Sequence, residues 1–256
     1  MLYASQDLGS LDFVSCSGAI TDDYFNANNE GNKCEPAQSQ ALSSDTKLVS
    51  LTFGGNDLGF SNVLQQCIYG KVTKVVFQGK DCSKNASLKA TVASRLKALG
   101  GQGNATTPKN VKIHSIASVL QSIHQLAPNA KIYVAGYPQL FGSNIRTECG
   151  VGTLNADGIH VALKLNKSEV AWLNSVGTQL NQVIKSAALA NNATFVDVDP
   201  KFKSHRFCDT GKSWFNPVTG SHGIKSGVTK FDVGSFHPTP TGQKSGYESA
   251  FAGDGL

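Results

Sequence analysis

The chain has 256 residues, of which 40% are hydrophobic and 16% charged, and it carries a net charge of +5. This composition suits a globular protein with a substantial core. No apolar run is long enough to span a bilayer, so we expect no integral membrane segment. The densest basic stretch has no interleaved aromatic residues, so we expect a solvated face there and no nucleic-acid site. Its members are Lys71, Lys74, Lys80, Lys84, Lys89, Arg95 and Lys97.

Strands and helices are predicted to alternate along the chain. A short strand at 11–15 leads into a turn and then into a helix from about Thr21. A second strand at 48–53 is apolar enough to be covered on both faces of a parallel sheet. Two further strands are predicted at 131–135 and 194–198.

Helices account for most of the remaining chain. They are predicted within 61–100 (the second of two near 86–99), over 112–127, from Asn166 onward and from Thr241 to the carboxyl terminus. The segments 142–165 and 200–235 are expected to be irregular. Alternation at this spacing predicts a parallel sheet with helices on both faces, built by residues 1–256 as one domain.

Six cysteines favour an oxidising compartment, and none has the C-x-x-C spacing of a zinc site or a redox motif. Cys67 and Cys82 bracket a basic loop and could staple it. Cys149 and Cys208 each follow a predicted strand and could tie two long loops together. The first residues lack the basic and apolar regions of a secretory signal peptide.

Three residues suggest acyl transfer. Asn56 follows the carboxyl end of the second strand in the turn Gly54-Gly55-Asn56-Asp57, where open α/β sheets bind ligands, and its amide can donate to developing negative charge. Gly18 offers a backbone N–H at another strand end, and His237 is a candidate general base. His205 has an equally polar setting but no partner motif. A polar turn that only ends a strand is the alternative for Asn56.

Three blocks of the sequence resemble those of the SGNH (GDSL-type) hydrolases, and in particular the secreted, disulfide-bonded lipases and esterases of actinomycetes. The blocks are Val14-Ser15-Cys16-Ser17-Gly18-Ala19, Leu51-Thr52-Phe53-Gly54-Gly55-Asn56-Asp57-Leu58-Gly59-Phe60 and Phe236-His237-Pro238-Thr239-Pro240-Thr241-Gly242-Gln243. Asp197-Val198, the stretch from Cys208 to Trp214 and Trp172-Leu173-Asn174 fit the same group, so the likeness covers essentially the whole chain.

The resemblance implies a flavodoxin-like three-layer α/β/α fold and cleavage of a small-molecule or lipid ester by a serine–histidine mechanism. It implies that the Gly18 N–H and the Asn56 side chain are two of three oxyanion-hole donors, with His237 as the base. It also implies the disulfides Cys67–Cys82 and Cys149–Cys208, no metal or cofactor, no nucleic-acid partner and a secreted monomer.

One departure from the family pattern concerns the histidine. The position three residues before His237, often an aspartate in the family, is Gly234 here, and Asp232 is the nearest carboxylate. This suits the subgroup in which a backbone carbonyl, here that of Gly234, accepts the imidazole N–H. Catalysis would then depend on a Ser–His dyad.

The second departure is the nucleophile. The Gly-Asp-Ser block of the first strand is not found, and no Gly-x-Ser-x-Gly elbow replaces it. Ser15, Cys16 and Ser17 flank the Gly18 turn, but the family uses this place for an oxyanion donor. We therefore expect an N-terminally truncated domain that lacks its first, central strand and is marginally stable or aggregation-prone. Cys16 is expected to be free or paired with Cys34.

Three hypotheses remain. The chain is a truncated copy of an active carboxylesterase or lipase, a pseudoenzyme that binds an acyl or glycan ligand, or an extracellular interaction domain that reuses the fold. Retention of Gly18, Asn56 and His237 favours the first, because a long-inactive copy has no chemical reason to keep all three.

Overall fold

The computed structural model describes residues 9–28, 35–77, 81–223 and 225–255. Its centre is a parallel three-stranded sheet in the order β1-β2-β5, formed by β1 (Leu48–Leu51), β2 (Lys131–Ala135) and β5 (Thr194–Val196). The register pairs Leu51 with Val134 and Ala135 with Val196. The predicted parallel α/β fold is therefore confirmed, and three of its four predicted strands are present.

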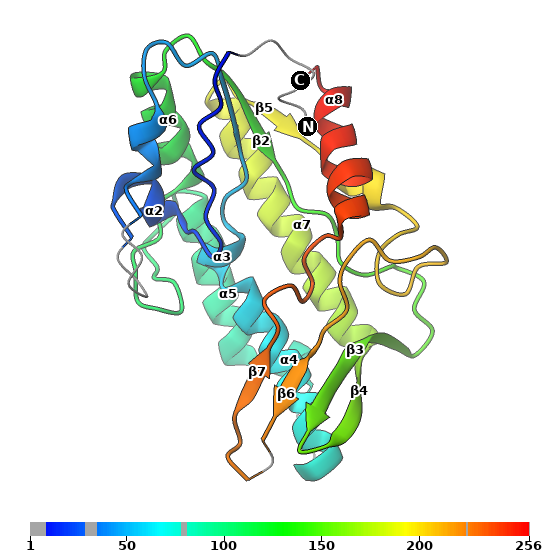
Figure 1. Ribbon diagram of the computed structural model, residues 1–256. Helices are drawn as coiled ribbons and strands as arrows, with labels where there is room; N and C mark the ends of the chain where they lie inside the picture. The colour runs from blue at the N-terminus through cyan, green and yellow to red at the C-terminus, as the bar shows by residue number, and fades with distance from the viewer. Residues whose placement is uncertain (1–8, 29–34, 78–80, 224, 256) are drawn as a thin grey trace.

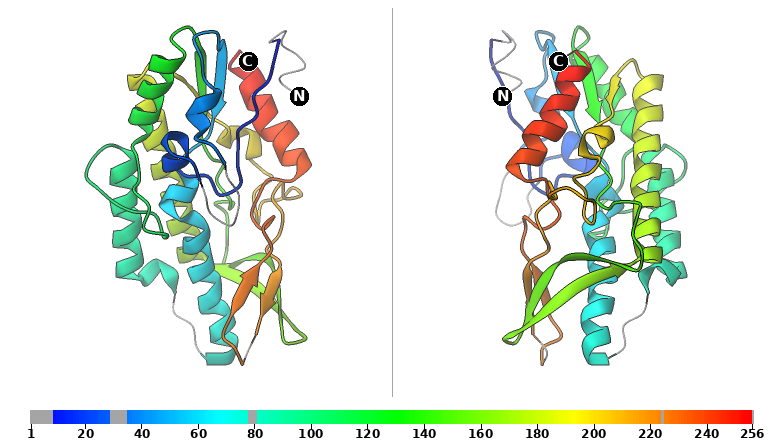
Figure 2. Two further views of the ribbon diagram at one scale, coloured as in Figure 1. Left: turned by 60° about the vertical axis from the view of Figure 1, so that its left-hand side comes forward. Right: turned by 90° about the vertical axis from the view of Figure 1, so that its right-hand side faces the viewer.

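Helices cover both faces of this sheet. One face packs against the core built with α5 (Ala86–Leu99), α6 (Ile116–Leu126) and α7 (Lys167–Ala190). The other face packs against the π-helix η5 (Gly242–Glu248) and α8 (Ser249–Gly253). Figure 2 shows α8 on the opposite side of the sheet from α7, which gives three layers.

The local sequence explains where the long helices begin. Asn166 accepts a hydrogen bond from the Glu169 N–H while the Glu169 carboxylate accepts one from the Asn166 N–H, the capping box that the sequence predicts. The amphipathic helix predicted over 112–127 starts later, at Ile116, because Ser115 caps it by accepting from the Ser118 N–H. The remaining helical elements are α2 (Thr21–Phe25), α3 (Gly55–Leu58), α4 (Phe60–Phe77), η2 (Gln38–Ala41), η3 (Cys82–Lys84) and η4 (Asp199–Phe202).

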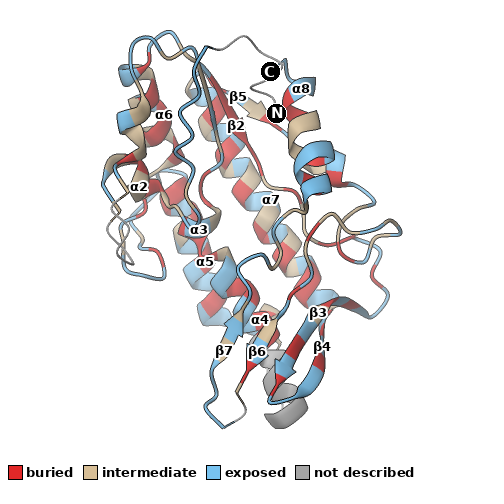
Figure 3. Cartoon of the chain, in the orientation of Figure 1, coloured by how far each residue is buried: buried red, intermediate tan, exposed pale blue. Residues whose placement is uncertain are grey.

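The prediction of a strand at 11–15 is wrong. No strand pairing among the described residues includes it, and the Val14 carbonyl accepts a hydrogen bond from the Gln38 side chain instead. Leu11 and Phe13 are 58% and 78% exposed, and Figure 3 shows this segment largely in the colour of exposed residues. Residues 11–15 have the apolar pattern of a strand, but among the described residues no neighbouring strand pairs with their backbone.

The prediction that the strand at 48–53 is covered on both faces is also wrong. β1 ends at Leu51 and lies at an edge of the described sheet, with Ser50 exposed and its other residues half-buried. β2, which has a partner on each side, is buried at every position after Lys131. The difference follows from position in the sheet, since both strands are rich in apolar residues.

The segment 142–165 is not irregular as predicted. It contains a hairpin of β3 (Glu148–Ala156) and β4 (Ile159–Asn166), joined by β6 (Gly220–His222) and β7 (Thr229–Phe231) into a sheet of order β4-β3-β6-β7. In Figure 1 this second sheet forms the lower part of the molecule. Its alternating burial is interrupted by a bulge between Gly150 and Gly152, which hides the period of two in the sequence.

Both predicted disulfides are present. Cys67–Cys82 joins α4 to η3, and Cys149–Cys208 joins β3 to the loop after η4. Cys34 lies outside the described residues, so the pairing of Cys16 with it is not tested. Within the described ranges, no helix is both long and apolar enough to cross a membrane.

Candidate active site

Asn56 lies in the one-turn helix α3, just beyond the end of β1. Gly54 precedes the helix with φ +108° and Gly59 ends it with φ +70°, both in the left-handed region that favours glycine. The Gly55 N–H donates to the Tyr137 hydroxyl at 3.0 Å, which fixes the turn against the end of β2. Burial raises the pKa of Tyr137, so its hydroxyl stays protonated.

The Asn56 side chain is exposed, and its Nδ2 donates to the Ala19 carbonyl at 2.9 Å. A carboxamide has two N–H groups, so this bond fixes the orientation of the amide and leaves a second N–H for another acceptor. The same bond brings Asn56 beside the residue that follows Gly18. Two of the three predicted site residues therefore lie together.

Gly18 lies in an exposed turn closed by the bond from the Ala19 N–H to the Cys16 carbonyl. Its φ of +82° is one that L side chains rarely adopt, and a Cβ built there would meet no atom within 4 Å. The glycine is thus required by backbone conformation and not by crowding. None of the described hydrogen bonds uses the Gly18 N–H, so this donor is available to another acceptor.

Asp57 is the residue that holds these two turns together, and sequence reasoning gave it no role. Its fully buried carboxylate accepts from the Thr21 N–H and the Thr21 hydroxyl, across 36 residues of sequence. The Thr21 hydroxyl in turn accepts from the His114 N–H at 2.9 Å. Burial raises the pKa of Asp57, although the hydrogen bonds from Thr21 lower it in part. An aspartate inside an apolar strand–turn block was the available signal.

His237 is exposed, and its Nδ1 lies 3.1 Å from the carbonyl oxygen of Ser235. The prediction of a backbone carbonyl in place of a carboxylate holds, but the residue was wrong. The Gly234 carbonyl instead accepts from the backbone N–H of His237, because the chain turns tightly through Phe236, whose φ is +63°. Asp232 accepts from the Thr219 hydroxyl, and none of the described hydrogen bonds joins it to His237.

His237 has no contact with Asn56 or Gly18 among the described interactions. A hydrogen bond from Nδ1 to the Ser235 carbonyl leaves Nε2 as the ring nitrogen that can accept a proton. His205, the other histidine considered, stacks on Trp214 with ring centroids 3.9 Å apart, and its Nδ1 lies 3.0 Å from the Lys212 carbonyl. These two contacts hold the His205 ring within the loop.

One cluster of potential metal ligands occurs among the described side chains, formed by Asp81, Cys82 and Glu169. Cys82 is in a disulfide and offers no thiolate. Asp81 accepts from Ser83 and Asn166, and Glu169 belongs to the capping box of α7. These bonds explain the cluster by helix capping, and we assign no metal to it.

Comparison with known proteins gives a consistent result. The model of the GDSL-like Lipase/Acylhydrolase family matches residues 4–244. Lipase 1 of Streptomyces coelicolor is 28% identical over 245 residues, covering 95% of this chain and 70% of its own length. The lipase of Streptomyces rimosus is 26% identical over 249 residues, covering 96% of this chain and 71% of its own length.

The fold has matching solved structures. Phospholipase A1 from Streptomyces albidoflavus NA297 superposes with a TM-score of 0.64 and 29% identity, covering 98% of this chain and 83% of its own. The extracellular lipase from Streptomyces rimosus gives a TM-score of 0.63 and 26% identity, covering 98% of this chain and 84% of its own.

Proposed function

The chain belongs to the GDSL-like lipase/acylhydrolase family, and we propose that its site cleaves carboxylic esters by a Ser–His mechanism. His237 is the general base, and the Gly18 N–H and the Asn56 side chain are oxyanion donors. The substrate is a small-molecule or lipid ester, and no metal or cofactor takes part. The two disulfides suit an extracellular protein. Its oligomeric state is proposed to be a monomer.

The observation that carries the proposal is the pairing of the Gly18 and Asn56 turns. Oxyanion donors act when they are held in place before charge develops, because no reorganisation is then needed during the reaction. The Asn56–Ala19 bond and the two bonds from Thr21 to Asp57 hold these turns in that way. Removing one such donor typically costs about 2.7–4 kcal/mol of transition-state stabilisation.

His237 is suited to proton transfer by its exposure and by its fixed ring. The Ser235 carbonyl selects the tautomer with the proton on Nδ1, so Nε2 can take the proton of an attacking hydroxyl and later return it to the leaving alkoxide. A backbone carbonyl cannot carry the negative charge of an aspartate. The imidazolium is therefore stabilised less than in a full Ser-His-Asp triad.

We further infer that the nucleophilic serine belongs to a Gly-Asp-Ser strand outside these 256 residues, so that residues 1–256 are one domain without its first strand. The printed sequence contains no Gly-Asp-Ser tripeptide. β1 is a half-exposed edge strand, and the apolar side chains of Leu11 and Phe13 are exposed. A further strand between β1 and the segment 11–15 would cover both.

The proposal is tested by an ester assay on two proteins. One is this chain. The other, the hybrid, carries ahead of residue 1 the Gly-Asp-Ser strand and following helix of a related Streptomyces lipase. We expect the chain alone to hydrolyse a short-chain nitrophenyl ester no faster than buffer and the hybrid to turn it over.

Single substitutions in the hybrid then test the assigned roles. Asn56→Ala should lower kcat/KM by about 10²–10³-fold and His237→Ala by about 10³-fold or more. The exposed residues Asn144 and His160 supply matched controls, and their change to alanine should leave turnover unchanged. A well-folded hybrid that binds substrate without turnover would instead favour the pseudoenzyme that binds an acyl or glycan ligand.

A further inference from the structure

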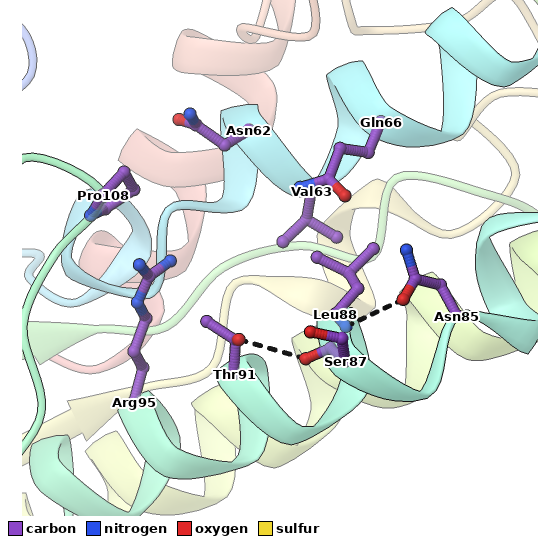
Figure 4. A pocket seen from close by; sticks show the side chains of 9 residues that line it. All are labelled: Asn62, Val63, Gln66, Asn85, Ser87, Leu88, Thr91, Arg95 and Pro108. Atoms are coloured by element: carbon purple, nitrogen blue, oxygen red, sulfur yellow. Dashed lines mark hydrogen bonds between the residues drawn. The ribbon is translucent and has the colours of Figure 1, made fainter.

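The short helix α3, which carries Asn56, is held at both ends by side chains from other elements. At its carboxyl end, the Leu58 carbonyl accepts from Nη1 of Arg95 at 3.2 Å. Arg95 comes from α5, where it lines a polar cleft of about 200 Å³ beside α4 (Figure 4). At the amino end, the Gly55 N–H donates to the Tyr137 hydroxyl at 3.0 Å. A helix of one turn has few hydrogen bonds of its own, so the position of Asn56 depends on such outside contacts.

The Tyr137 ring leaves little room for a side chain at position 55. A Cβ there would lie 3.0 Å from both Cζ and the hydroxyl oxygen of Tyr137, closer than a Cβ normally approaches its neighbours. The backbone of Gly55, unlike that of Gly18 and Gly54, is outside the left-handed region. Crowding by Tyr137 therefore explains this glycine, whereas backbone conformation explains the other two.

Tyr137 is itself held by one carboxamide from α7. The Tyr137 N–H donates to Oδ1 of Asn181 at 2.7 Å, and Nδ2 of Asn181 donates to the Tyr137 carbonyl at 2.7 Å. Gly136 admits this carboxamide, because a Cβ at that position would lie 2.9 Å from Oδ1 of Asn181. Both main-chain groups of Tyr137 are thus bonded to a single side chain that is 44 residues away in sequence.

The preceding residue of α7 lies against the same turn. A Cβ at Gly54 would lie 3.1 Å from Cδ1 of Leu180, a side chain that is 3% exposed. α7 therefore meets the turn directly through Leu180 and indirectly through Asn181 and Tyr137. None of the described hydrogen bonds joins Asn181 to Asn56 itself.

We propose that Asn181 and Tyr137 are positioning residues for the oxyanion donor Asn56, an inference that rests on the proposed esterase function. The path runs from the Asn181 carboxamide through Tyr137 to the Gly55 N–H, one residue before Asn56. A donor stabilises an oxyanion when it lies about 2.7–3.1 Å from the oxygen that becomes charged, so a small displacement weakens it. Ester binding does not need this precision. Loss of either positioning residue should therefore lower kcat and leave KM nearly unchanged.

The first measurement uses the 256-residue chain and needs no turnover. Asn181→Ala is compared with Asn174→Ala, a second asparagine of α7 that bonds to a backbone carbonyl, that of Phe141, at 3.0 Å. Nuclear magnetic resonance follows the two side-chain N–H resonances of Asn56, which are separated when one N–H is bonded to the Ala19 carbonyl. We expect Asn181→Ala to shift them together and Asn174→Ala to leave them in place.

The second measurement is turnover in the hybrid. Tyr137→Phe should lower kcat about 10- to 100-fold and change KM by less than about twofold. Tyr133→Phe is the matched control, because its hydroxyl lies on the same strand and bonds to the Gly255 carbonyl at 3.4 Å. It should leave both constants unchanged.

A double-mutant cycle in the hybrid tests whether the two residues act through one path. The combined loss of kcat in Asn181→Ala/Tyr137→Phe should be well below the product of the two single losses, because both substitutions disturb the same contact with Gly55. Single losses that multiply, or a change in KM without a change in kcat, would overturn the proposal.

The two measurements separate this proposal from the esterase function. If the unsubstituted hybrid does not hydrolyse the ester, the esterase function fails, and the Asn56 resonances of the 256-residue chain still decide whether Asn181 positions that side chain. Asn56 resonances that stay in place in Asn181→Ala, or that move equally in Asn174→Ala, would overturn the positioning role whatever the hybrid does.

Discussion

The two sides of the candidate site are held by different kinds of interaction. On the Asn56 side, side chains reach across to backbone: Asp57 binds Thr21, and Asn56 binds Ala19. On the His237 side, backbone binds backbone. The Asn216 N–H donates to the His237 carbonyl at 2.9 Å and the Thr239 N–H to the Trp214 carbonyl at 2.7 Å.

Packing reinforces the same contrast. The loops on the His237 side enclose a cluster of aromatic rings, in which Phe202 stacks on Phe215 at 5.1 Å and Phe207 meets Phe236 edge-on at 5.6 Å. The Cys149–Cys208 disulfide closes this region. On the Asn56 side, the buried carboxylate of Asp57 holds the turns together. The stability of the Asn56 side should therefore depend on pH, and the stability of the His237 side should depend on the disulfide.

The largest effect is expected from removing the Cys149–Cys208 disulfide by Cys149→Ala/Cys208→Ala. The disulfide closes a loop of 59 residues, and the chain-entropy model gives about 4 kcal/mol of unfolding free energy for a loop of that length. Denaturant unfolding measures it. Removing Cys67–Cys82, which closes 15 residues, should cost about 3 kcal/mol. If removal of Cys67–Cys82 lowered the unfolding free energy as much or more, the His237 side would not depend specially on its disulfide.

Asp57→Ala tests the other side, with an expected loss of about 2–3 kcal/mol, because two buried groups of Thr21 lose their acceptor. The loss should depend on pH. Burial raises the pKa of Asp57 in the folded state, so its contribution is fully present below the unfolded value of about 3.9 and declines as pH rises through the folded value.

The advantage of the parent chain over Asp57→Ala should therefore be greatest at acidic pH and shrink toward neutral pH. Urea unfolding at several pH values measures this, with the exposed Asp45→Ala as control. A difference that grows with pH would mean that the folded protein stabilises the charged form of the carboxylate and lowers its pKa.

The smallest effect is expected from Phe13→Ser on the strandless segment before Gly18. Phe13 is 78% exposed, so the change in unfolding free energy should be within about 0.5 kcal/mol. Phe53→Ser, in the core at 9% exposure, should cost several times more. In the hybrid, Phe13→Ser should become costly, since the added strand would cover it. An unchanged small effect there would argue against that strand position.

The sequence was sufficient for features with local signals. Strand–helix alternation predicts the parallel sheet, the Asn166–Glu169 pair predicts the start of α7, and the resemblance implies both disulfides. The Gly54 and Gly18 turns were also recognisable, because only glycine readily takes their backbone conformations.

Other features depend on contacts that no local pattern encodes. The segment 11–15 has the composition of a strand but no ladder partner among the described residues, and β1 is half-exposed because it lies at an edge of the described sheet. The carbonyl that faces His237 is displaced by one residue, because Phe236 adopts a positive φ. The role of Asp57 depends on Thr21, and a separation of 36 residues hides that pairing.

We propose that this chain supplies the oxyanion donors and the general base but not the nucleophile. Labelling with a fluorophosphonate tests it directly, since a nucleophilic serine Oγ displaces fluoride from phosphorus and keeps the phosphonyl group, which is read by intact mass. We expect no labelling of the 256-residue chain. In the hybrid we expect labelling on the serine of the Gly-Asp-Ser strand, and His237→Ala should abolish it. Stoichiometric labelling of the 256-residue chain itself, at Ser15, Ser17 or any other residue, would show that the chain carries its own nucleophile.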